Sequence, residues 1–164
     1  NRKGSLAEHR KTQTLRFLQD NIVAYPDTTW GDGEIFADYR CSPGYPVDTY
    51  REGNRYRVLI SLRRTMNRGD TEQLHIERTI RDGFTSDIEE FQTEVNHFTD
   101  VLRISVIFPK SRLPEEVLLL KRNEATTLEL TGEHRQILAD GRHRYSWQTK
   151  HPRRFEAYIM RWHW

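Results

Sequence analysis

The C-terminal part of the chain interleaves arginine with aromatic residues, a combination suited to binding rather than to bond-making chemistry. Between Arg142 and Trp164 there are six basic residues and one acidic residue, Glu156, and the basic residues alternate with tyrosine, tryptophan and phenylalanine. Guanidinium groups pair with carboxylates and phosphates and also stack on aromatic rings. We therefore predict a binding surface, and its candidate residues are Arg142, Arg144, Arg153 and Arg154.

An acidic stretch lies upstream of these arginines. Seven acidic residues fall between Glu72 and Glu94, against two arginines, Arg78 and Arg81. The C-terminal arginines would pair with the carboxylates of this stretch or of an acidic protein partner. They would also pair with the phosphates of single-stranded nucleic acid, whose bases stack on aromatic side chains. A simpler alternative is that arginine and aromatic residues alternate because the strand has one wet face and one buried face. The net charge of only +2 favours this alternative or a protein partner over nucleic acid.

No catalytic or metal-binding motif occurs in the sequence. The seven histidines form neither a His-x-His nor a His-x-x-x-His pair. Two pairs of carboxylates are adjacent in sequence and would point to opposite faces of a strand, so neither pair can converge on one substrate atom. These pairs are Glu89/Glu90 and Glu115/Glu116. Nucleophile elbows, Walker loops and dinucleotide-binding glycine motifs are missing. We therefore predict a domain that is not an enzyme and that binds no metal or cofactor.

Two short features resemble functional motifs but have plainer explanations. The integrin-recognition tripeptide Arg-Gly-Asp occurs at residues 68–70, yet glycine and aspartate are also the residues that a tight turn requires. Cys41 is the single cysteine, so it forms no internal disulfide, and no histidine or asparagine signature surrounds it. We predict a plain hairpin turn and an inert thiol.

Residues 1–25 are predicted to form an amphipathic helix. Ser5 and Glu8 have the spacing of a capping box, which satisfies two backbone donors at a helix start. A narrow apolar stripe follows at helical spacing, formed by Leu15, Leu18 and Ile22. Such a helix would pack on the edge of a sheet or pair with the same helix of a second copy, which would give a homodimer.

The rest of the chain has the pattern of a β protein. Residues 26–54 are predicted to be an irregular connecting segment, because prolines and glycines interrupt them repeatedly. From Tyr56 onward apolar residues recur at every second position, and short strands follow at intervals of about ten residues. The predicted fold is mainly β: an immunoglobulin-like β-sandwich of about seven to eight strands over residues 55–164, preceded by the helix. Residues 86–96 fit either a helix or an edge strand.

The chain ends on large side chains that alternate along the backbone. Tyr158, Met160, Trp162 and Trp164 share one face if the segment is extended. We predict that this segment is a final strand tied into a sheet, and that removing its last five residues unfolds the domain.

One resemblance is visible in the second half of the sequence. The segment LRISVIFPKSRLPEEVLLLKR and the closing YIMRWHW resemble a β-rich module at the C-terminal end of some bacterial regulators and other multidomain proteins. The shared pattern is a strand, a loop between two prolines, a second strand and an end that alternates tyrosine with tryptophan. It covers residues 56–164 and implies an accessory domain, with no known activity that could be carried over to this chain. Because the first residue is Asn1 rather than methionine, we expect a processed product or a piece of a longer protein.

The composition describes a folded domain with a heavily charged surface. Hydrophobic residues make up 35%, charged residues 30% and aromatic residues 11% of the 164 residues, and disordered chains are poor in aromatics. The longest apolar run, residues 117–120, is far too short to span a membrane. No secretory signal is evident, so we predict a cytoplasmic protein without a membrane span.

These features lead to three functional hypotheses. The first is a non-enzymatic interaction module of a larger, bacterial regulatory or signalling protein, which binds a partner protein or another domain of the same polypeptide through a charged surface. The second is a nucleic-acid-binding domain that uses the basic N-terminal helix and the C-terminal arginine and aromatic residues. The third is a small-molecule sensor, with its ligand held among Trp30, Tyr145 and Trp147.

Overall fold

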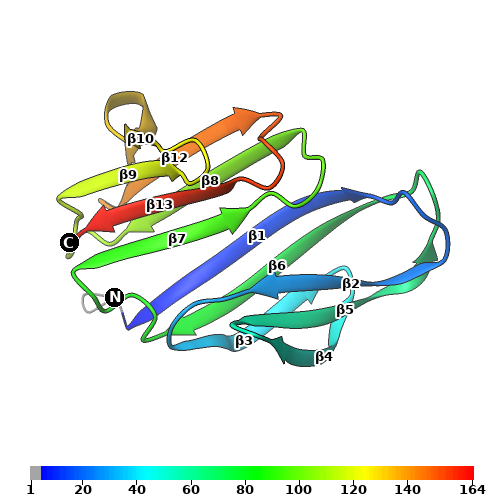
Figure 1. The fold of residues 1–164 in the computed structure, drawn as a ribbon. Coiled ribbons are helices and arrows are strands. Elements are labelled where there is room, and N and C mark those ends of the chain that lie inside the picture. The colour runs from blue at the N-terminus through cyan, green and yellow to red at the C-terminus, as the bar shows by residue number, and fades with distance from the viewer. Residues whose placement is uncertain (1–4) are drawn as a thin grey trace. The chain divides into compact units, whose positions relative to one another are not determined.

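The computed structural model describes residues 5–164, and almost all regular structure in that range is β (Figure 1). Thirteen strands form four antiparallel sheets, and the one helical element among residues 5–164 is a single 3-10 turn, Gly132–His134. The prediction of a mainly-β fold is therefore confirmed. The chain divides into two compact units, and we call them the N-terminal unit, which ends at Phe84, and the C-terminal unit, Thr85–Trp164. No described helix is long and apolar enough to cross a membrane.

Two three-stranded sheets make up the N-terminal unit. The first has the order β1 (Leu6–Arg16), β6 (Thr71–Arg81), β3 (Glu34–Ser42), and the second has the order β2 (Ile22–Thr29), β5 (Arg55–Met66), β4 (Tyr45–Glu52). Apolar side chains of β5 and β6 meet between the sheets and form the core of the unit: Val58, Ile60, Leu62, Met66, Leu74 and Ile76. The alternating pattern from Tyr56 onward thus marks two central strands, each with its buried face toward the other sheet.

The predicted N-terminal helix is wrong, because Leu6–Arg16 is strand β1 and pairs with β6 along its full length. Its burial alternates at every residue, as in a strand with one covered face. The covered positions include polar residues, His9, Lys11 and Gln13, so no apolar alternation is visible in the sequence. The homodimer and the nucleic-acid surface that we expected this helix to form therefore lose their basis.

Residues 26–54 are not the irregular connection that we predicted, since most of them lie in β2, β3 and β4. Pro26 lies in β2 and Pro46 in β4, and these are the two edge strands of their sheet. A proline that lacks the N–H donor is tolerated at a sheet edge, because no neighbouring strand needs that donor. The prolines therefore mark edge strands here instead of loops.

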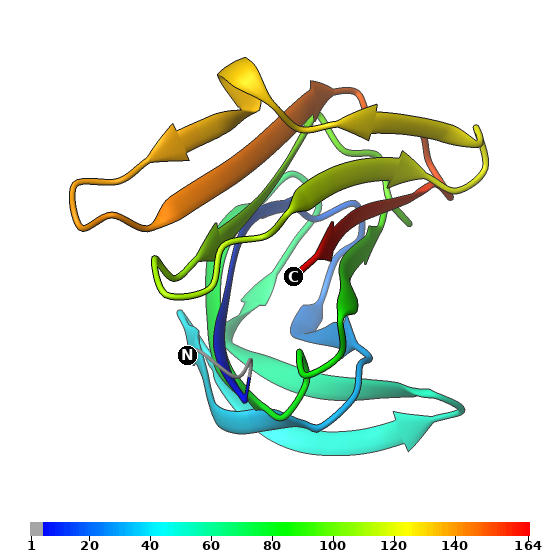
Figure 2. The ribbon, with the colours of Figure 1, turned by 90° about the vertical axis from the view of Figure 1, so that its left-hand side faces the viewer.

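Two sheets also make up the C-terminal unit. One has the order β10 (Thr126–Glu129), β9 (Glu116–Lys121), β13 (Ala157–His163), β7 (Ile88–Glu94), and the other has the order β11 (Arg135–Ile137), β12 (His143–Lys150), β8 (Val101–Phe108). Figure 2 shows β12 in orange beside its partner β11. The ambiguous residues 86–96 thus contain strand β7.

The strands do not form the single sandwich of seven to eight strands that we predicted over residues 55–164. β5 and β6, assigned to that sandwich, pair with strands that precede residue 55 and belong to the N-terminal unit. The unit boundary falls between Phe84 and Thr85 instead of near residue 55. Local periodicity identified these strands, but it carries no information on which partners they choose.

The terminal segment is strand β13, one of the two inner strands of its sheet. It pairs with β7 on one side and with β9 on the other (Figure 1). Trp162 is buried against Phe108, with ring centroids 5.4 Å apart, and the guanidinium of Arg112 lies 3.9 Å from the centroid of the Trp164 ring. The last residue is also tied to the fold, because its backbone N–H donates to the carbonyl oxygen of Asp87.

The hairpin tip between β5 and β6 contains the Arg-Gly-Asp tripeptide and forms a plain turn. The Asp70 carboxylate accepts a hydrogen bond from the Asn67 N–H at 2.8 Å, and Gly69 adopts a φ of 93°, a region that favours glycine. Two backbone hydrogen bonds join Gly69 and Asp70 to Phe17. The aspartate therefore serves the turn.

Candidate functional site

One arginine on the surface of the C-terminal unit contacts two exposed aromatic rings. The guanidinium carbon of Arg154 lies 4.8 Å from the ring centroid of Phe98 and 4.6 Å from that of Phe155. Phe98 is 87% exposed and Phe155 is 64% exposed, although burial of an apolar ring is energetically favourable. We call Phe98, Arg154 and Phe155 the Arg154 stack.

The backbone holds Phe155 in this exposed position. Its φ is 65°, in the left-handed region that bulky residues rarely adopt. Its N–H donates to the carbonyl oxygen of Val95 at 2.6 Å, and its own carbonyl accepts from the Asn123 side-chain amide at 2.7 Å. Strained backbone of this kind persists only where the surroundings fix it, and it is concentrated at functional sites.

A buried carboxylate fixes the base of the same loop. Glu156 is fully buried, and its Oε1 accepts hydrogen bonds from the backbone N–H groups of Asn123 and Ala157 at 2.8 and 2.9 Å. The Arg153 N–H donates to the hydroxyl of Tyr158, a core residue, at 3.0 Å. The loop that carries Arg153 and Arg154 is therefore anchored at both ends, while both arginine side chains remain exposed.

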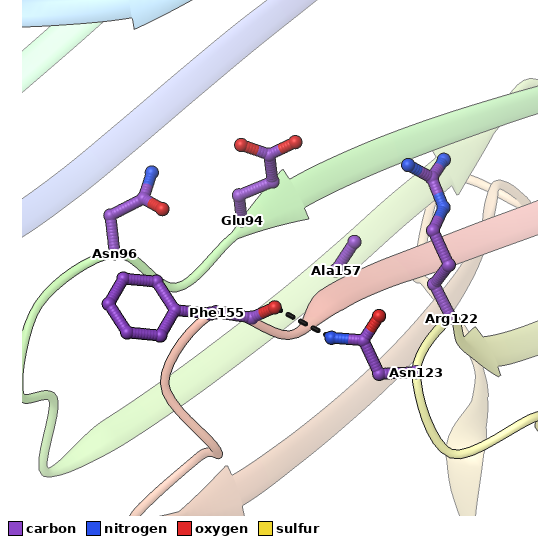
Figure 3. Close-up of a pocket in the computed structure, with 6 residues that line it drawn as sticks. All are labelled: Glu94, Asn96, Arg122, Asn123, Phe155 and Ala157. Atoms are coloured by element: carbon purple, nitrogen blue, oxygen red, sulfur yellow. Dashed lines mark hydrogen bonds between the residues drawn. The ribbon is translucent and has the colours of Figure 1, made fainter.

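A shallow hollow of about 220 Å³ lies next to Phe155 (Figure 3). Its lining is mostly polar and comes from the ends of β7 and β9, the 151–156 loop and the start of β13: Glu94, Asn96, Arg122, Asn123, Phe155 and Ala157. Arg122 also lines a second hollow, of about 270 Å³, so the two adjoin at this side chain. Open hollows with a mixed polar lining suit a flat or extended partner more than an enclosed small molecule.

The four predicted arginines do not form one site. Arg153 and Arg154 lie in the anchored loop after β12, whereas Arg142 and Arg144 lie at the start of that strand. The nine residues of extended chain from Arg142 to Lys150 span about 25 Å. Arg142 forms an ion pair with Asp140 at 2.7 Å, and Arg144 is half-buried opposite Ile107. Phe98, in contrast, belongs to the site but was not among the predicted residues. It is a single phenylalanine in a polar loop, and no pattern in the sequence marks it.

The aromatic residues proposed for a small-molecule site each have a partner in their own unit. Trp30 lies 5.0 Å below the guanidinium of Arg55 in the N-terminal unit. In the C-terminal unit Trp147 stacks on Tyr158 at 5.4 Å, and Tyr145 is buried edge-on to Phe108. Neither hollow described above is lined by any of the three.

The N-terminal unit contains a second group of interest, a buried set of charged residues between its sheets. Asp27 of β2 is only 3% exposed, and it accepts hydrogen bonds from Lys11 Nζ at 2.9 Å and from the Tyr39 hydroxyl at 3.1 Å. Arg78 of β6 is 8% exposed and faces the same interior, opposite His9 in the β1–β6 register. We call His9, Lys11, Asp27, Tyr39 and Arg78 the Asp27 cluster.

Burial dominates the electrostatics of this cluster. It lowers the pKa of His9 to about 3, assisted by the positive charges of Arg78 and Lys11, so the imidazole is neutral. Burial, and then the Asp27 carboxylate, raise the pKa of the Tyr39 hydroxyl and of the Cys41 thiol, so neither ionises readily. Burial also lowers the pKa of Arg78, against the attraction of Asp27. In residues 5–164, no group of three or more His, Cys, Asp or Glu side chains is placed to hold a metal ion.

The neutral state of His9 predicts a dependence of stability on pH. In the unfolded chain His9 takes up a proton near its ordinary pKa of 6.5, whereas in the folded chain it does so only near pH 3. Its contribution is therefore fully present above pH 6.5 and falls below it by about 1.4 kcal/mol per pH unit. Denaturant unfolding at pH 6.0 and 4.5 should show a smaller loss of stability for His9→Gln than for the wild type. Equal losses would contradict this prediction.

Comparison of this chain with models of protein families, with characterised proteins and with solved structures found no match.

Proposed function

We propose that the protein is a non-enzymatic interaction module, and that the Arg154 stack is the centre of its surface for a protein partner. The module belongs to a larger bacterial regulatory or signalling protein, in keeping with the resemblance of residues 56–164 to accessory domains. The hollow beside Phe155 and the exposed side chain of Arg153 extend the same surface.

One observation carries this proposal: two exposed phenylalanine rings contact the same guanidinium, and one of them is on strained backbone. An exposed phenylalanine contributes little to folding, and a left-handed bulky residue costs on the order of 1–3 kcal/mol. Both features are expected where a partner covers the rings. Aromatic residues and arginine are also the types enriched in the core of protein interfaces.

The charges around the stack indicate what kind of partner fits. Lys150, Arg153 and Arg154 are exposed in or beside the loop and outnumber the two acidic residues beside it, Glu94 in the hollow and the exposed Asp100, while Glu156 is buried and bonded. A complementary surface therefore presents carboxylates around an apolar centre. Such charges steer the encounter and fix its register more than they add affinity.

The proposal predicts a specific loss of partner binding when the stack is disrupted. Affinity capture from the native host with the full-length protein should recover a partner that Arg154→Glu fails to retain, because the substitution repels carboxylates and removes the contact between the rings. A residue at the centre of an interface is typically worth about 2 kcal/mol or more, so affinity should fall about 30-fold or more.

The matched control is Arg142→Glu, which reverses an exposed arginine at the other end of β12 and outside the stack. The partner should bind this variant normally. If Arg154→Glu retained every partner of the wild type, a binding role for the stack would have to be abandoned.

Single-stranded nucleic acid is the second candidate, and the exposure of the two rings favours it. Bases stack on exposed aromatic side chains, and arginines beside them contact phosphates. Fluorescence anisotropy with single- and double-stranded oligonucleotides at two salt concentrations separates the candidates. Salt-dependent binding that Arg154→Glu abolishes would favour nucleic acid, and an absence of binding would eliminate it.

A further inference from the structure

Arg78 is a buried cation whose donors are not all used. Only 8% of the residue is exposed, and its Nε is fully buried without a hydrogen-bond partner. A guanidinium carries five N–H donors in a rigid plane and keeps its charge inside proteins. Buried polar groups are almost always bonded, and a buried charge is normally paired, so this nitrogen requires an explanation.

The carboxylate in the cluster is already occupied. Asp27 Oδ1 is bonded to Lys11 and Oδ2 to Tyr39, and the Lys11 pair lies 2.9 Å apart. His9 is neutral, so two cations, Lys11 and Arg78, face one anion, Asp27, and the cluster has a net charge of +1. The positive charge in excess is located at Arg78, the more deeply buried of the two cations.

We propose that the N-terminal unit binds a small monovalent anion against the Arg78 guanidinium, within the Asp27 cluster, and that a carboxylate is the best-matched ligand. One monovalent anion brings the cluster to neutrality. Doubly charged phosphate would leave a net negative charge beside Asp27 in a dry interior. The fork formed by Nε and a terminal nitrogen of arginine matches the two oxygens of a carboxylate, whereas a halide meets it at a single point.

The test is thermal unfolding of the full chain at pH 7, where His9 is neutral, with sodium acetate or sodium chloride at equal ionic strength. The wild type should show a saturable rise in Tm, about 3–5 °C at ten times the dissociation constant, because the anion binds only the folded state. Acetate should act at lower concentration than chloride. The opposite order would support the site and assign it to a halide.

Two variants separate the site from a general salt effect. Arg78→Met removes the buried cation, so the saturable response should disappear, while the Tm in anion-poor buffer should not fall far below that of the wild type. Arg81→Met removes an exposed arginine of the same strand and should keep the full response. An equal response in Arg78→Met, or no saturable response in the wild type, would overturn the proposal.

A second measurement needs only the wild-type protein, in case Arg78→Met does not fold. Chloride that exchanges with a protein site broadens the ³⁵Cl NMR line, and acetate should reverse this broadening as it takes the same place. Broadening that acetate does not reverse, together with no effect of acetate on Tm, would overturn the site.

Discussion

A chain that lacks residues 160–164 is expected to lose the cooperative unfolding transition of the C-terminal unit. Those residues supply more than half of β13, the strand on which both β7 and β9 depend. Removing them exposes the edges of β7 and β9 that pair with β13, and the Phe108 ring that packs on Trp162. The measurement is circular dichroism and calorimetric unfolding of the truncated and the complete chain. Unchanged melting would show that the tail is free and would restore it as a candidate binding element.

A single substitution isolates the packing part of this effect. Trp162→Ala should cost about 3–5 kcal/mol, the usual range for a large aromatic residue lost from a core. Ile137→Ala, at an exposed position of β11 in the same unit, should change stability by no more than about 0.5 kcal/mol. If the two substitutions had similar costs, Trp162 would not be a core residue.

Asp27→Asn is the second large effect that we expect, with a loss of about 3–5 kcal/mol in the free energy of unfolding. The amide keeps the shape of the side chain but leaves Lys11 and Arg78 without a counter-charge in the interior, and an uncompensated buried charge is costly. Lys11 can move its amine to water, since its side chain is 34% exposed. Arg78 is too deeply buried to do so.

Two comparisons give this prediction its control. Adding Arg78→Met to Asp27→Asn should recover part of the lost stability, because it removes the charge that the first substitution stranded. Glu90→Gln breaks an exposed ion pair with Arg161 and should cost no more than about 1 kcal/mol. Denaturant unfolding of all four proteins measures these differences. Similar costs for Asp27→Asn and Glu90→Gln would show that the interior of the N-terminal unit is wet.

The two proposed sites fail independently of one another. The Arg154 stack is an exposed feature of the C-terminal unit, and its test is the loss of a partner. The anion site is buried in the N-terminal unit, and its test is a response to acetate or chloride. Loss of partner binding in Arg154→Glu therefore gives no information on Arg78, and the reverse also holds.

The sequence alone determined the strands whose covered face is apolar. β5, β6 and β8 cover every second side chain over most of their length, and burial of an alternating apolar face is a local property that each segment displays by itself. The same logic correctly placed Trp162 on a paired strand, β13, whose first four residues are all buried. Turn chemistry likewise explained the Arg-Gly-Asp tripeptide without any knowledge of its surroundings.

Only the tertiary structure decided which strands pair and which polar residues are covered. β1 resembled a helix because its covered positions include His9 and Lys11, whose burial depends on partners that are distant in sequence, Asp27 and Arg78. The prolines of β2 and β4 suggested loops, because a local pattern cannot reveal that a strand lies at a sheet edge. Phe98 and Arg154 are 56 positions apart, and only the fold brings them together. The periodicity of a segment shows which of its faces is exposed to solvent. A site depends on contacts between segments, and no local pattern contains these.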